Sequence, residues 1–259
     1  MKINITKYLK TVQMSAQSTT NGGILYLLPN YLMKVFYVVP MFLLWKTLME
    51  SGVETGMTLS QMLTYTYLGA IFSDLLVVIT PASGWLYEGL FVSLYQRPLR
   101  IFSHLASQTV GKWIPNLLFF TLPMIIAAPL FNVSLRTWSL WFFPSLILCI
   151  SLGFAVDFLF ACMTIRMINA SWLVYVIRMA VVSFLSGSVI PFKILPWGLE
   201  QVFQYLPFGS LAAAPLAIYT GLSEPIPLLV TQIFWNIVLW PVAFIVFDKS
   251  QEGMMSFGG

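Results

Sequence analysis

Residues 138–163 have the sequence WSLWFFPSLILCISLGFAVDFLFACM, in which Asp157 is the one charged side chain. A helix of about 20 mostly apolar residues is long enough to cross the hydrocarbon core of a membrane. The stretch does not alternate between apolar and polar residues, as a barrel strand does. It therefore predicts a membrane-spanning helix, and it indicates that the rest of the chain also folds in lipid.

The composition of the whole chain agrees with this interpretation. Of the 259 residues, 59% are hydrophobic and only 8% are charged, with a mean hydropathy of +0.85. Ordinary soluble domains are about a quarter charged, and charged side chains supply most of their surface coat. We therefore predict an all-α integral membrane protein with one transmembrane domain over residues 1–259.

Long apolar runs recur along the chain, and each is long enough to cross a membrane. Backbone amides cannot stay unpaired in lipid, so we expect every run to be helical. The six predicted spans are Tyr31–Met49, Leu59–Thr80, Leu105–Phe131, Trp138–Met163, Trp172–Ile190 and Ile226–Phe247.

The basic residues predict the orientation of these spans. Six spans place both termini on one side, and basic residues favour the cytoplasmic side. That side would hold Lys2, Lys7, Lys10, Arg97, Arg100, Lys112, Arg166 and Lys249, with Lys34 reaching towards it. We therefore expect a multi-pass protein with cytoplasmic termini.

The N-terminal segment 1–23 mixes lysines with apolar residues at helical spacing. Such a segment is typical of an interfacial helix that lies along the cytoplasmic surface against anionic lipid. It stays polar for too long to contain the apolar core of a signal peptide. A disordered tail is the alternative.

The outer connection 191–225 contains apolar runs between prolines, and none of these runs is long enough to span. Proline interrupts helices because it lacks an N–H donor. We therefore expect short re-entrant helices that dip into the outer leaflet.

The segment GWLYEGLFVSLYQRPLR, residues 84–100, belongs to a predicted cytoplasmic loop over 84–104. Apolar residues recur at three- and four-residue spacing between Trp85 and Gln96, so a short amphipathic helix is expected there. Pro98 would end it. These residues alone support two interpretations equally: an interfacial helix, and a contact site for a partner protein.

Two acidic residues, Asp74 and Asp157, fall inside predicted spans, where a carboxylate usually faces a cavity or a partner. Both are candidates for a translocation path. A structural pair with Arg178, or a polar tip that reaches cytoplasmic water, is the alternative.

Several chemical motifs are missing from the sequence. It contains no G-x-x-x-x-G-K-[ST] phosphate loop, no H-E-x-x-H pair and no G-x-S-x-G elbow, and it has one histidine. We therefore expect neither an enzyme nor a cofactor or metal bound by this chain.

Two stretches resemble type-2 ABC exporter permeases. Residues 88–98, EGLFVSLYQRP, resemble the coupling helix that lies between spans two and three in that family. Residues 184–209, FLSGSVIPFKILPWGLEQVFQYLPFG, are similar to its proline-broken outer segment, and Pro215 and 218–221 continue the pattern. The resemblance covers nearly the whole chain.

The resemblance implies a permease subunit of a bacterial plasma membrane exporter, which pairs with a second permease, the same or homologous. Two separate ATP-binding subunits would carry ATP and magnesium. The coupling residues would be Glu88, Gly89, Leu94, Arg97, Pro98 and Arg100, and the extracellular gate residues would be Gly187, Pro191, Pro196, Pro207 and Phe208. The cargo would be a toxic, antibiotic-like or amphipathic small molecule or peptide. A lipid or glycolipid exporter subunit and a self-contained proton-coupled carrier are the alternatives.

Overall fold

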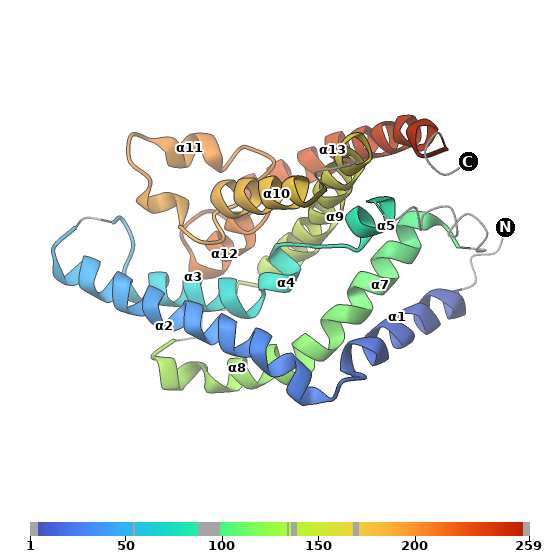
Figure 1. Cartoon of the computed structure of the whole chain (residues 1–259). Coiled ribbons are helices and arrows are strands. Elements are labelled where there is room, and N and C mark those ends of the chain that lie inside the picture. The colour runs from blue at the N-terminus through green and yellow to red at the C-terminus, as the bar shows by residue number, and fades with distance from the viewer. Residues whose placement is uncertain are drawn as a thin grey trace.

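The computed structural model describes residues 5–53, 55–87, 99–133, 135, 139–167 and 171–255. Within these ranges the chain is all-helical without a strand, as predicted (Figure 1). The elements are α1 (Ile5–Thr20), η1 (Ile24–Leu27), α2 (Leu28–Glu50), α3 (Leu59–Ile71), α4 (Ser73–Leu76), α5 (Ala82–Tyr87), α7 (Ile101–Asn116), η2 (Leu117–Thr121), α8 (Leu122–Ala127), η3 (Ala128–Phe131), α9 (Phe142–Arg166), α10 (Ser171–Leu185), η5 (Phe192–Ile194), α11 (Leu199–Phe203), α12 (Ala213–Thr220) and α13 (Pro225–Met255).

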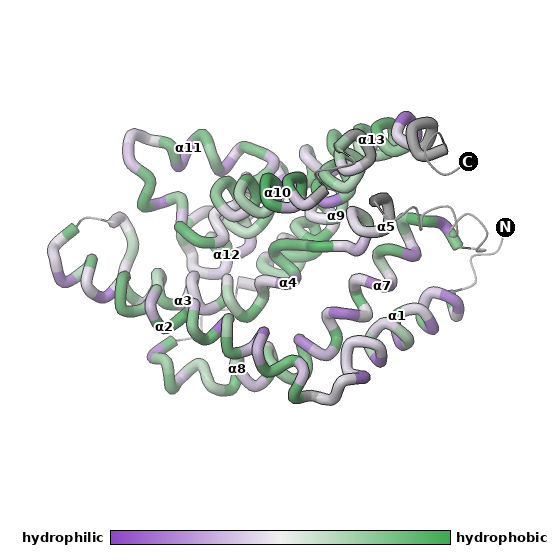
Figure 2. The backbone as a smooth tube through the Cα atoms, viewed as in Figure 1, coloured by the Kyte–Doolittle hydropathy of each residue, from purple (hydrophilic) through white to green (hydrophobic). Residues whose placement is uncertain are grey.

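Among the described residues, four helical segments are long and apolar enough to cross a membrane, namely Leu25–Glu50, Ile101–Phe131, Phe142–Thr164 and Pro225–Ser250. They coincide with the first, third, fourth and sixth predicted spans. Large apolar side chains of α2, α8 and α10 are exposed, and Figure 2 shows that α10 consists mostly of hydrophobic residues. Large apolar side chains that are exposed in the isolated chain fit a lipid environment better than water.

The second predicted span, Leu59–Thr80, is not one continuous helix. A capping box at Thr58 and Gln61 starts α3, which ends at Ile71, and α4 ends at Leu76. Residues 77–81 are not helical, and α5 follows them. Pro81 explains part of this break, because proline disfavours the helical conformation in the residue before it.

The fifth predicted span, Trp172–Ile190, is also shorter than expected. Helix α10 ends at Leu185, and Gly187 then has a φ of 70°. At 1.5 Å per residue, its 15 residues extend about 22 Å, which is less than the roughly 30 Å of a hydrocarbon core. Among the described residues, the turn that follows α10 must cover the remaining thickness of the hydrocarbon core.

The connection 191–225 contains short helices, as predicted. These are η5, α11 and α12, but Pro215 lies inside α12 instead of ending a helix. Helix α12 is buried over nearly its whole length and contacts α3, α9 and α13. The segment thus returns into the body of the protein.

Helix α1 lies along α7, and the described start of α1 lies on the same side of the molecule as the end of α13 (Figure 1). The contact is close because α7 carries a glycine there. A Cβ at Gly111 would lie 2.5 Å from the Val12 carbonyl oxygen. The Ser15 hydroxyl donates to the Gln108 carbonyl oxygen at 2.7 Å. One side of α1 is therefore packed on protein, while Ile5 and Leu9 on another side stay exposed.

Polar side chains join α9 to α13 inside the body. The Gln232 amide donates to the carbonyl oxygens of Ser145 and Ser210 at 3.1 and 2.8 Å, and the Ser145 hydroxyl donates to Gln232 at 2.9 Å. About two turns further along α13, Trp240 Nε1 donates to the Ser151 hydroxyl at 3.0 Å. Such interhelical hydrogen bonds stabilise helix pairs where lipid offers no partner.

Candidate functional site

A groove of about 260 Å³ opens on the face between α2, the α3–α4 segment and the turn after α10. Ligand pockets usually measure about 300–1,000 Å³, so this groove needs another wall to enclose a drug-sized molecule. We call it the lateral groove. It is lined by Met33, Lys34, Tyr37, Gly69, Ala70, Ser73, Leu76, Val77, Ser188 and Val189.

Lys34, one of the lining residues, forms an ion pair with Asp74, which is not itself a lining residue. Lys34 Nζ is 2.7 Å from Asp74 Oδ2, and the Asn116 amide donates to the same oxygen at 3.1 Å. Lys34 Nζ also lies 5.1 Å from the centroid of the Phe120 ring. The side chains of Lys34 and Asp74 are 12% and 30% exposed, so the pair is partly accessible.

The turn at Gly187 forms another part of the groove wall. The Tyr65 hydroxyl donates to the Gly187 carbonyl oxygen at 2.7 Å, and the Ala213 N–H donates to the Ser186 carbonyl oxygen at 2.8 Å. A Cβ at Gly187 would lie 2.8 Å from Ala213 Cβ, and its positive φ also favours glycine. The turn is thus fixed between α3 and α12.

The other predicted gate residues are spread along the outer connection. Pro191 is buried and lines a separate cavity of about 30 Å³, which is room for about one water molecule. Pro196 is exposed, whereas Pro207 and Phe208 are half-buried. Of the predicted gate set, Gly187 is therefore the residue that adjoins the lateral groove.

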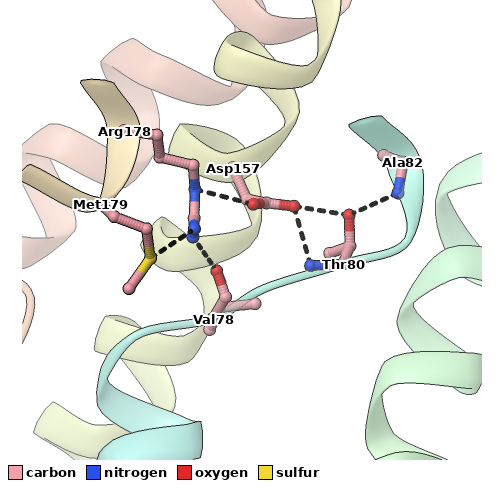
Figure 3. A network of polar contacts seen from close by, with 6 residues as sticks. All are labelled: Val78, Thr80, Ala82, Asp157, Arg178 and Met179. Carbon is pink, nitrogen blue, oxygen red and sulfur yellow. Dashed lines mark hydrogen bonds and ion pairs between the residues drawn. The ribbon is translucent and has the colours of Figure 1, made fainter. Parts of the chain in front are cut away.

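Asp157 has a different environment from Asp74. Its Oδ1 lies 2.9 Å from Arg178 Nε, and its Oδ2 accepts hydrogen bonds from the N–H, at 3.0 Å, and the hydroxyl of Thr80 (Figure 3). Arg178 also donates to the Val78 carbonyl oxygen. Asp157 is 1% exposed and does not line the lateral groove. The structural alternative, a pair with Arg178, thus describes Asp157, while Asp74 pairs with Lys34.

The predicted coupling residues Glu88, Gly89, Leu94, Arg97 and Pro98 lie outside the described residues. Arg100 is described and exposed, and its carbonyl oxygen accepts the first backbone hydrogen bond of α7, from the His104 N–H at 2.9 Å. It therefore stands where the loop joins the third span. Among the described residues, no group of His, Cys, Asp and Glu could hold a metal ion.

Some site residues could not be recognised from the sequence. Lys34 stands out as a lysine inside an apolar run, but its position suggested only that it reaches the cytoplasmic surface. Tyr65 and Ser188 carried no signal, because their roles depend on the turn at Gly187. Thr80 could have been suspected from Pro81, which favours an extended residue before it.

No model of a known protein family matches the chain, and no curated protein matches it. The proposals below therefore rest on the sequence and on the geometry of the described residues.

Proposed function

We propose that this chain is the membrane permease subunit of an ATP-driven exporter of the type-2 ABC class. The observation that carries the proposal is the broken second span. Residues 77–81 join α4, which lines the lateral groove, to α5, which leads directly into the basic loop 84–104. A push on that loop would therefore reach the groove wall through a few residues.

In this proposal the lateral groove is one half of the translocation path. It is open on one side, and a second permease chain, the same or homologous, would close it. The neighbouring face of α2 carries the exposed side chains of Met33 and Phe36, which a protein partner or lipid must cover. Two ATP-binding subunits, with ATP and magnesium, would dock at Glu88, Gly89, Leu94, Arg97, Pro98 and Arg100 on the cytoplasmic side of a bacterial plasma membrane.

The lining favours an amphipathic cargo. Most of the groove is apolar, and its polar groups are few: the Lys34 ammonium and the side chains of Tyr37, Ser73 and Ser188. Pockets of this kind hold apolar molecules and orient them by a few polar contacts. A toxic or antibiotic-like small molecule or peptide fits this description, and a lipid or glycolipid with a small head group fits it too.

The first test is co-purification. The tagged chain is expressed with its neighbouring genes in its own host, extracted in mild detergent, and its partners are identified by mass spectrometry. We expect a stoichiometric soluble subunit with a phosphate-binding loop, and a second membrane chain would show a heteromeric pair. Recovery of this chain alone, with transport that persists without ATP, would overturn the proposal.

The second test addresses the loop. Replacing Arg97 and Arg100 together by glutamate should abolish ATP-dependent transport in membrane vesicles while the protein still inserts. The matched control reverses the charge of Lys46, an exposed lysine near the C-terminal end of α2, away from the loop. Normal export by the double variant would contradict the coupling role.

The Lys34–Asp74 pair favours a self-contained proton-coupled carrier as the second candidate, because the Asp74 carboxylate is partly exposed and its partner Lys34 lines the groove. In that case transport should follow a pH gradient without ATP, and Asp74→Asn should abolish it. Transport by Asp74→Asn that is still driven by ATP would exclude the carrier.

A further inference from the structure

Residues 77–81 interrupt the second predicted span inside an apolar body, where unpaired backbone groups are costly. Their neighbours supply the missing partners. The Val78 carbonyl oxygen accepts from Arg178, and the Thr80 N–H donates to Asp157 at 3.0 Å. The Thr80 hydroxyl in turn accepts from the Ala82 N–H at 3.1 Å, at the start of α5. Side chains from α9 and α10 thus replace the hydrogen bonds of a helix turn.

The segment also packs against α9 at a glycine. A Cβ at Gly153 would lie 2.6 Å from Val78 Cγ2, so a larger residue would push the segment away from α9. Gly153 and Asp157 are four residues apart and lie on the same face of this helix. Residues 77–81 are therefore fixed to α9 at two successive turns.

We propose that Arg178 and Asp157 are positioning residues that hold 77–81 as a fixed bend, and that this bend sets the direction of α5. Figure 3 shows the arrangement: Arg178 and Asp157 point towards each other, and the segment 78–82 passes both of them. When the pair is broken, α5 moves away from α9, while α3 and α4 stay in place because Tyr65 and Thr66 tie α3 to the rest of the body. This inference goes beyond the proposed function, and its test does not measure transport.

The chain carries its own reporters for this movement. Both cysteines lie on α9, they are buried, and they flank Asp157. Cys149 lies near the Leu76 carbonyl oxygen at the end of α4, at 3.8 Å. Cys162 belongs to a buried cluster that contains Ala82 of α5 together with residues of α7, α9 and α13. Movement of α5 should therefore expose Cys162 and leave Cys149 covered.

The experiment measures alkylation by N-ethylmaleimide of the full-length chain in native membranes, with mass spectrometry to separate the two sites. Arg178→Met keeps the side chain long but removes the ion pair and the hydrogen bond to Val78. It should raise the alkylation rate of Cys162 roughly tenfold through local opening, with little change at Cys149. Arg178→Lys keeps the charge that faces Asp157 and should restore most of the protection.

The matched control is Gln232→Met, which removes an equally buried polar contact of α9, to α13 instead of to 77–81. It should not raise alkylation of Cys162 relative to the wild type. Thr80→Val keeps the backbone hydrogen bond to Asp157 and should give a smaller rise than Arg178→Met. An unchanged rate at Cys162 in folded Arg178→Met, or an equal rise at both cysteines, would overturn the inference. Because transport is not measured, failure here leaves the exporter proposal standing, and failure of co-purification leaves this one standing.

Discussion

The Asp157–Arg178 pair and the Lys34–Asp74 pair both join helices in the apolar body, but they differ in exposure and in what else they bind. Arg178 and Asp157 are about 3% and 2% exposed in their side chains, and hydrogen bonds to 77–81 satisfy them further. Lys34 and Asp74 are 12% and 30% exposed in their side chains, and Lys34 lines the lateral groove. One pair is closed to its surroundings, and the other is open, in that both of its side chains are partly exposed.

The difference indicates that one membrane protein can use an ion pair between a basic residue and an aspartate for two purposes. Removing one partner of a buried pair leaves an unpaired charge, which is strongly destabilising. A partly exposed pair is weaker, since water or a ligand can replace either partner. The closed pair is therefore expected to matter for structure, and the open pair for what enters the groove.

The largest effect is expected for Arg178→Met. Leaving Asp157 buried and unpaired should lower the free energy of unfolding by roughly 3–5 kcal/mol. Unfolding of the purified protein in mixed micelles with increasing SDS measures this loss. The double variant Asp157→Asn with Arg178→Met should lose less, because no charge is then left unpaired. A double variant that is less stable than Arg178→Met would show that the unpaired charge of Asp157 is not the main cause of the loss.

A smaller effect is expected for Gly153→Ala, which adds a Cβ 2.6 Å from Val78 Cγ2. Overpacking of this kind costs about 1–3 kcal/mol, more than alanine gains over glycine in helix propensity. Gly69→Ala is the matched control, since its Cβ would be 3.5 Å or more from its neighbours. Thermal unfolding of the two variants side by side should show a loss for Gly153→Ala only.

For the open pair, Lys34→Met should change stability by roughly 1 kcal/mol, because Asp74 keeps its hydrogen bond from Asn116 and is partly exposed. The same SDS titration measures it. A loss as large as that of Arg178→Met would show that partial exposure does not weaken the Lys34–Asp74 pair.

The smallest effect is expected at the surface. Lys46 Nζ and Glu50 Oε1 are 4.0 Å apart and both side chains are mostly exposed. Exposed pairs contribute little, so Lys46→Ala should shift the free energy of unfolding by less than about 0.5 kcal/mol. This variant calibrates the scale: if its shift equals that of Lys34→Met, the two pairs cannot be ranked by exposure.

The sequence predicted the long apolar helices well, because hydropathy over 20 residues decides between lipid and water. The same measure is blind to a backbone that changes conformation inside an apolar run. Residues 77–81 are as apolar as a helix would be, and only Pro81 signalled the break. The pairing of Asp157 with Arg178 was named only as an alternative to a place in the translocation path, beside a polar tip that reaches cytoplasmic water. The partner of Lys34 and the turn at Gly187 depend on contacts between helices distant in sequence.

The contact of α1 with α7 has a consequence for biosynthesis. Ser15 and Gln108 are 93 residues apart in the chain. At roughly 5–20 residues per second, α1 leaves the ribosome about 5–20 seconds before the helix it packs on exists. During that interval its lysines and exposed apolar residues have only the membrane surface to bind. The N-terminal helix is thus expected to be a membrane-bound segment first and a packed one later, when α7 arrives with Gly111.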